Sequence, residues 1–219
     1  GPRPLRPSDV MILLRSPGSV LPHYVRALEE EGIPWAADGG GDMFETTEVR
    51  VALSILQIVD NPRQDVPLIA ALRSPVYGFT ADQLALIRGE GDGDFYSALE
   101  RAAERGDPAC RDFLDQLAQL RFGAGDRTCR QLISHIYETT NLPGIFGAMP
   151  GGRERQDNLT ALYALAGQLE ESGCRTLFQF LLRLDRLRET GARFAAPGSG
   201  GGGGGGFILF IPPSKGVEG

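Results

Sequence analysis

The chain has 219 residues, 42% of them hydrophobic, and a formal net charge of −6 at pH 7. These values allow a sizeable core in one large or two small domains, and the acidic balance excludes a uniformly cationic nucleic-acid-binding protein. No apolar run approaches the ~20 residues that a membrane span needs, and no secretory signal is visible, so we expect a cytoplasmic protein without a membrane partner.

The first forty residues contain two apolar runs separated by an amphipathic stretch. Residues 1–2, Gly-Pro, resemble the remnant of a cleaved expression tag and are set aside. Residues 9–14 form a short apolar run typical of a buried strand, and residues 33–37 are typical of a second one. Residues 22–31 have the apolar spacing of a helix, which Gly32 would end. The pattern predicts a small α/β element.

From residue 45 almost to residue 190, the spacing of the apolar residues is that of helices. Apolar residues recur every three to four positions, and Gly, Asp and Pro breaks separate the periodic segments. Thr80 is a good N-cap for one of these segments. The segments expected to be helical are residues 45–60, 66–72, 81–88, 94–105, 109–122, 127–140, 157–171 and 175–190. They predict a mainly α fold, a helical bundle beside a small α/β edge.

The C-terminal part begins with a glycine run. Residues 197–206 cannot bury a core, so we interpret them as a flexible linker or as a placeholder for another loop. Residues 207–211 are again apolar and predict a strand.

Groups that could bind a metal or perform covalent chemistry are sparse. Cys110, Cys129 and Cys174 are widely spaced and odd in number, which fits neither a disulfide framework nor a zinc site. We expect them to be reduced core residues. His23 and His135 have no neighbouring ligands, so we expect no metal site and no catalytic residue in this chain.

Several short strings occur in the order found in superfamily 1 DNA helicases of the UvrD/Rep/RecB type. The first of them, residues 9–16, resembles helicase motif IV. The collinear strings are Asp9 to Ser16, Phe44-Glu45 with Glu48-Val49, Val51 to Ser54, Asp60 to Pro62 with Gln64-Asp65 and Pro67-Leu68, Leu72 to Pro75, Leu84 to Arg88, and Met149 to Gly152 with Arg155-Gln156 and Asn158-Leu159. Over residues 6–191 the chain resembles most closely the AddA family of ATP-dependent helicase/nuclease subunits, which belong to bacterial complexes that process double-strand breaks.

This resemblance implies that the chain contains parts of a helicase motor. Residues 3–75 would hold the start of lobe 2A, an incomplete RecA-like lobe, and lead into helices. Residues 76–196 would hold the helical, 2B-like domain. Residues 207–219 resemble a degraded motif V, in which Pro212 and Gly219 stand where the family has histidine and phenylalanine.

The family's function is implied in the same way. The complete protein would be an ATP-dependent 3′–5′ DNA helicase and exonuclease of double-strand-break repair and recombination, using ATP and Mg²⁺ and paired with an AddB-like second subunit. This fragment would guide duplex DNA, and its junction with single-stranded DNA, to the motor. It lacks a phosphate-binding loop and an acidic Walker B string, so we expect it to be inactive alone. The alternative is a protein-interaction or regulatory helical module that docks on the partner nuclease subunit.

Arg15 is the candidate nucleotide-binding residue. The resemblance implies that this arginine reaches the nucleotide γ-phosphate, and a guanidinium matches phosphate oxygens bidentately. Leu14 stands where the family often has an aromatic residue that stacks on adenine. The alternative is a strand-end arginine that pairs with a local carboxylate.

Two arginine-containing segments are candidates for DNA contact. Glycines at a helix start leave backbone N–H groups free for an anion, and neighbouring arginines add phosphate donors. The alternatives are arginines that pair with Glu154 and Asp157 in the first segment, and a solvated helix face in the second. The candidate DNA-binding residues are Gly151, Gly152, Arg153, Arg155, Gln156, Arg183 and Arg186.

Overall fold

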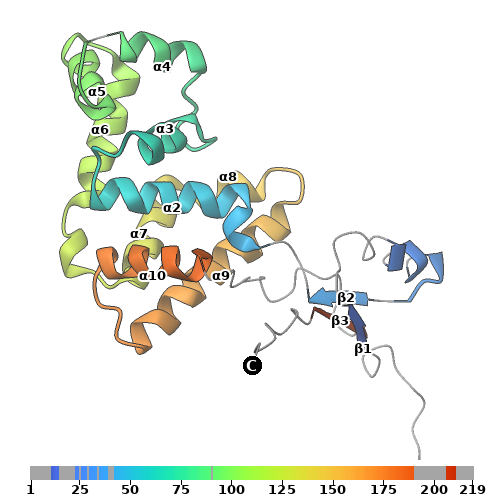
Figure 1. The fold of residues 1–219 in the computed structure, drawn as a ribbon. Helices are drawn as coiled ribbons and strands as arrows, with labels where there is room; N and C mark the ends of the chain where they lie inside the picture. The colour runs from blue at the N-terminus through green and yellow to red at the C-terminus, as the bar shows by residue number, and fades with distance from the viewer. Residues whose placement is uncertain are drawn as a thin grey trace, which may run out of the picture. The chain divides into compact units, whose positions relative to one another are not determined.

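The computed structural model describes residues 11–14, 23–24, 26–28, 30–33, 35–38, 42–89, 91–189 and 206–210. The chain forms two compact units, one of residues 1–43 with 193–219 and one of residues 44–192 (Figure 1). Arg15 and the residues resembling motif V after Phe210 lie outside the described residues.

The first unit contains a three-stranded parallel sheet. Its strands are β1 (Met11–Leu14), β2 (Trp35–Asp38) and β3 (Gly206–Phe210), in the order β1-β3-β2. Met11 pairs with Phe207, and Trp35 pairs with Gly206. Helical residues between positions 23 and 30 lie between β1 and β2 in sequence, as a crossover between parallel strands requires. The expected α/β edge is confirmed, with the C-terminal strand at its centre.

The second unit is a bundle of helices, which confirms the mainly α fold class. The long helices α2 and α9 contact each other (Figure 1). The helices are α2 (Thr47–Asp60), α3 (Asp65–Arg73), α4 (Ala81–Arg88), α5 (Phe95–Glu104), α6 (Pro108–Arg121), α7 (Cys129–Thr140), α8 (Leu142–Gly147), α9 (Gly152–Glu171) and α10 (Leu177–Glu189), with 3-10 turns η2 (Met43–Glu45) and η3 (Ala124–Asp126). Within the described residues, none of them is both long and apolar enough to cross a membrane.

The division into units differs from the boundary expected after residue 75. Most of α2 is buried, and this helix packs against α3, α6, α8, α9 and α10. A helix that is apolar on nearly every side belongs inside a core. Helices α2 and α3 are therefore part of the bundle, and the boundary lies at Met43 and Phe44.

Two features of the bundle differ from the expected helices. Helix α8 was not expected, because Leu142-Pro143-Gly144 resembles a loop; proline is nevertheless compatible with a first helical turn. Helix α9 begins at Gly152, five positions before the expected start at residue 157. Residues 153–156 therefore lie within the helix.

The helix cap at Thr80 and the state of the three cysteines agree with the sequence predictions. Thr80 caps α4, accepting a hydrogen bond from the Gln83 backbone N–H within a complete capping box. The three cysteines are free and buried, as expected. Burial, together with the neighbouring Cys174 thiol, raises the pKa of Cys129 to about 12, so it is a core residue and a poor nucleophile at neutral pH.

Candidate functional site

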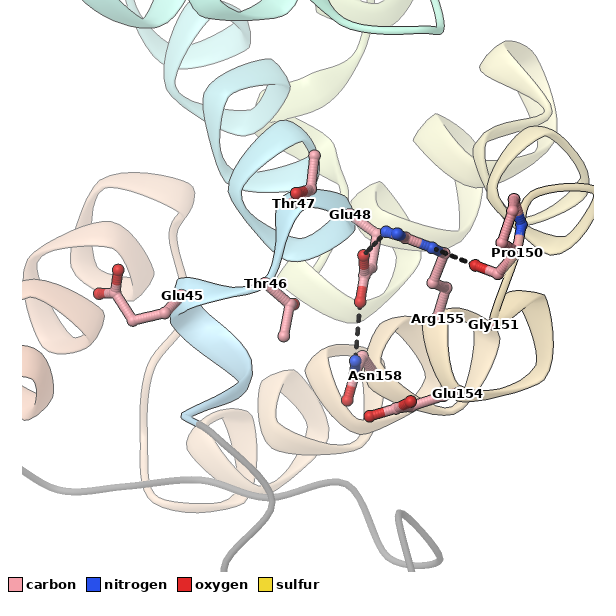
Figure 2. A pocket seen from close by; sticks show the side chains of 9 residues that line it. All are labelled: Glu45, Thr46, Thr47, Glu48, Pro150, Gly151, Glu154, Arg155 and Asn158. Carbon is pink, nitrogen blue, oxygen red and sulfur yellow. Dashed lines mark hydrogen bonds and ion pairs between the residues drawn. The ribbon is translucent and has the colours of Figure 1, made fainter. Parts of the chain in front are cut away.

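A pocket of about 290 Å³ lies where the N-terminal ends of α2 and α9 meet (Figure 2). We call it the Glu48 pocket. On one side, its residues come from η2, the cap of α2 and the first turn of α2. On the other side, they come from the turn that precedes α9 and from the first two turns of α9. The lining residues are Glu45, Thr46, Thr47, Glu48, Pro150, Gly151, Glu154, Arg155 and Asn158.

The centre of the pocket is a fully paired buried carboxylate. Glu48 is 2% exposed. Arg155 Nη1 lies 2.7 Å from Glu48 Oε2, and Asn158 Nδ2 donates to Glu48 Oε1 at 2.7 Å. Figure 2 shows both contacts, with Arg155 Nε also donating to the Pro150 carbonyl at 3.1 Å. Because a buried charge is costly unless it is paired and hydrogen-bonded, this network holds α2 against α9.

The two helices position these groups for simple reasons. Arg155 and Asn158 are three residues apart on α9, so they share a face of the helix. Glu48 lies in the first turn of α2, where the helix dipole favours a negative charge. The alternative for the first arginine segment was a pair with Glu154 or Asp157. Arg155 instead pairs with Glu48.

The charge of the Glu48 pocket does not favour phosphate. Three carboxylates line it, from Glu45, Glu48 and Glu154, against the single guanidinium of Arg155. Glu45 and Glu154 are exposed. Since like charges repel and Arg155 already pairs with Glu48, an anionic ligand would gain little here.

The remaining candidates around the start of α9 mostly make contacts within the helical unit. Gly151 is the N-cap of α9, with a positive φ of 71°. A Cβ on Gly152 would overlap the carbonyl of Gly147. Gln156 Nε2 donates to the Pro143 carbonyl at 3.1 Å, which ties α9 to α8. Arg153 differs: it is exposed, and it has no ion pair with any described residue.

Arg183 and Arg186 are both exposed on α10. Arg183 Nη1 donates to Ser172 Oγ at 3.3 Å, an exposed hydrogen bond. Neither residue lines the Glu48 pocket. The structure therefore brings Arg155 and Gly151 together but does not join the two arginine segments in one pocket.

A second pocket, of about 410 Å³, lies over α2 between α3 and α10. We call it the α2 groove. Thr47, at the start of α2, also lines the Glu48 pocket. The lining residues are Thr47, Arg50, Val51, Leu53, Ser54, Gln57, Val66, Pro67, Ala70 and Arg188. Sequence reasoning missed this groove, although Thr47, Arg50, Ser54 and Gln57 form a polar stripe at helical spacing on an otherwise apolar helix.

Neither pocket gathers the side chains of a metal site. Within the described residues, no three His, Cys, Asp or Glu side chains come together in a way that could hold a metal ion. The central polar groups of the Glu48 pocket bond to one another, and the α2 groove has no acidic residue in its lining. The arrangement is suited to holding helices together and to binding.

Comparison with known proteins shows which proteins this chain resembles in sequence. No protein-family model matches the chain. It is 40% identical to the ATP-dependent helicase/nuclease AddA of Geobacillus kaustophilus and 42% identical to that of Pelotomaculum thermopropionicum. Each match covers 99% of this chain and 18% of the relative. The protein of the same name from Clostridium novyi is 38% identical over 96% of the chain.

The chain therefore spans less than a fifth of the length of the curated relatives that it matches. The match extends over nearly all of the chain and agrees with the collinear strings in its sequence. The expected resemblance is confirmed: this chain is homologous to one segment of the ATP-dependent helicase/nuclease AddA.

Proposed function

We propose that the chain is part of an ATP-dependent DNA helicase/nuclease subunit and that its helical unit guides duplex DNA toward the motor. The observation that supports this proposal is its similarity, over 99% of its length, to proteins of that name. The complete protein would act as a 3′–5′ helicase and exonuclease in double-strand-break repair and recombination. It would use ATP and Mg²⁺ and pair with an AddB-like subunit in the cytoplasm.

Within that protein, residues 44–192 would form the 2B insertion and the parallel sheet would belong to lobe 2A. Arg15 follows β1 directly in the sequence. Ligands of open parallel sheets bind beyond the carboxyl ends of the strands, which supports a nucleotide contact for Arg15. The test is ATP affinity in the complete subunit, where Arg15→Ala should raise the ATP concentration needed for half-maximal hydrolysis and Arg15→Lys should raise it less.

The DNA contacts would come from the exposed arginines. Arg153, Arg183 and Arg186 are exposed, so their guanidinium groups can reach a phosphate backbone without breaking a buried ion pair. Arg155, Gln156, Gly151 and Gly152 would act indirectly, by fixing the start of α9. Such phosphate contacts position DNA without reading its sequence.

Salt-dependent binding tests the DNA role. The full chain would be titrated with a labelled duplex that has a single-stranded tail, by fluorescence anisotropy at several salt concentrations. Changing Arg153, Arg183 and Arg186 together to Gln should reduce the slope of log K against log salt by up to ~3, since each phosphate contact contributes ~0.9. Arg121→Gln, an exposed arginine at the end of α6, is the matched control. Absence of binding at low salt would remove the DNA role from this chain.

The second candidate function is docking on the partner nuclease. Two observations favour it: the net charge of −6 and the exposure of large apolar side chains such as Phe122 (83%) and Phe178 (63%). The discriminating experiment is a pull-down of the chain with the AddB-like protein in the absence of DNA. Retention that Phe178→Ser weakens and that nuclease treatment does not change would support docking.

A further inference from the structure

The α2 groove is lined by apolar residues of α2 and α3 and by polar residues of α2. Val66 and Ala70 on α3 are exposed, Val66 to 82%, although they border a concave surface. Pro67, Val51 and Leu53 also belong to the apolar lining. Apolar side chains that gather around one concave surface, rather than being scattered singly, are a feature of interaction sites.

The charges of the groove have a single sign. Arg50 and Arg188 line it and no acidic residue does, in a chain whose net charge is −6. Arg50 is exposed and forms no ion pair with any described residue. Arg188 Nη2 lies 3.8 Å from Glu45 Oε1, a long contact between exposed groups that contributes little. Both guanidinium groups are thus available to the carboxylates of a binding partner.

We propose that the α2 groove binds a short amphipathic helix whose apolar side chains pack on Val66, Pro67 and Ala70 and whose flanking carboxylates pair with Arg50 and Arg188. Its source would be a second protein that presents such a helix. An amphipathic helix commonly docks in a groove between helices through apolar anchors spaced three and four residues apart. Arginine is suited to such interface pairs because its guanidinium is weakly hydrated and binds a carboxylate with two hydrogen bonds. The proposal does not rest on the DNA-guiding role, which uses other arginines.

The lining favours a peptide over nucleic acid. A sugar-phosphate backbone would place charged oxygens against Val66 and Ala70, where they would lose water without gaining a donor. Single-stranded nucleic acid is usually held by bases stacked on aromatic rings, and no aromatic residue lines the groove. Charge complementarity together with an apolar wall therefore selects an acidic, amphipathic protein segment.

The test uses the full chain labelled with ¹⁵N and three probes, compared by NMR titration. The first probe is a stapled helical peptide with leucines on one face and glutamates on both flanks. The second has glutamine at each glutamate position, and the third is a blunt DNA duplex. We expect saturable binding of the glutamate peptide, with shifts concentrated at Arg50, Ser54, Val66 and Ala70.

Variants of the groove then show how much the two arginines and Val66 each contribute to peptide binding. Arg50→Gln with Arg188→Gln should weaken the glutamate peptide about three- to tenfold and leave the glutamine peptide unchanged, because exposed ion pairs contribute modestly. Val66→Gln should weaken both peptides. Arg121→Gln, at the end of α6 and outside the groove, is the matched control and should change neither. An unchanged amide spectrum outside the groove shows that each variant is folded.

Several results of the titration would overturn the proposal. They are no saturable binding of the glutamate peptide, equal affinity for the glutamine peptide, shifts confined to other surfaces, and displacement of the peptide by duplex DNA from the same residues. Shifts in the groove that depend on protein concentration alone would also overturn it, in favour of self-association.

Discussion

The Glu48 pocket and the α2 groove adjoin the same helix, yet their charged groups behave in opposite ways. Glu48 and Arg50 are two positions apart, so the 3.6-residue repeat of α2 turns them to opposite sides. On one side, Glu48, Arg155 and Asn158 satisfy one another in a buried network. On the other, Arg50 is exposed and forms no ion pair with a described residue. A charge that the fold has already paired supports the structure, whereas an unpaired one is available to a partner.

The largest expected effect comes from breaking the buried pair. Arg155→Met would leave the Glu48 carboxylate buried without its counter-charge and should lower the free energy of unfolding by about 2–4 kcal/mol, as measured by urea denaturation. The value lies toward the lower end for buried pairs because the Arg155 side chain is 32% exposed.

A double variant separates two causes of the lost stability: the loss of the attraction between Glu48 and Arg155, and the cost of leaving the Glu48 charge buried without a partner. Combining Glu48→Gln with Arg155→Met removes the buried charge as well, so this protein should be more stable than Arg155→Met alone. If Arg155→Met unfolds at the same urea concentration as the parent, the network does not hold α2 against α9.

The two adjacent glycines beside the Glu48 pocket should differ in their tolerance of a methyl group. Gly152→Ala would drive a Cβ into the Gly147 carbonyl, and the backbone of α8 would have to shift, at a cost of about 2–3 kcal/mol. Gly151→Ala meets no atom within 4 Å but must keep a positive φ, at a cost of about 1 kcal/mol. Equal melting temperatures for the two variants would contradict this packing of α8 on α9.

This part of the molecule also shows where sequence reasoning stopped. The cap at Thr80 and the helix expected over residues 175–190 were predictable, because caps and helical spacing are local signals. The contact of Glu48 with Arg155 joins residues 107 positions apart, and no local pattern encodes it.

The sheet shows the same limit. Three apolar runs were recognisable as strands from their composition, and each lies close to its expected position. Their order was not predictable, because β3 enters between β1 and β2 only after a long intervening stretch of chain that includes the whole bundle. The beginning of α9 was misplaced because Gly151 and Gly152 resemble a loop, although Gly151 is the cap of the helix.

An exposed pair of the same length sharpens the comparison. Arg63 Nη1 lies 2.7 Å from Asp94 Oδ2, the same distance as in the Glu48 pair, but the two side chains are 54% and 29% exposed. The hydrogen bond from the Ser97 backbone N–H, followed by the contact with Arg63, lowers the pKa of Asp94 below its usual range. A lowered carboxyl pKa stabilises the folded state above the unfolded-state value, and that contribution is lost as pH falls through the folded value.

Asp94→Asn should therefore reduce stability at neutral pH, and its difference from the parent should shrink below about pH 4. The expected loss is smaller than for Arg155→Met, because water screens an exposed pair. Urea denaturation between pH 7 and pH 3 measures both proteins. Because asparagine can still cap α5, a difference that stays constant over this range would mean that the charge of Asp94 does not account for the effect.

The smallest effect is expected at Arg50, and it is the sharpest check on the comparison. Since its guanidinium has no ion-pair partner among the described residues, Arg50→Gln should change the free energy of unfolding by less than about 0.5 kcal/mol. Arg155→Gln, the same substitution on the paired side, should cost several times more. Urea denaturation of the two variants in one buffer makes the comparison direct. A loss above about 1 kcal/mol at Arg50 would show that its charge stabilises the bundle, and it would then not be free for a partner's carboxylate.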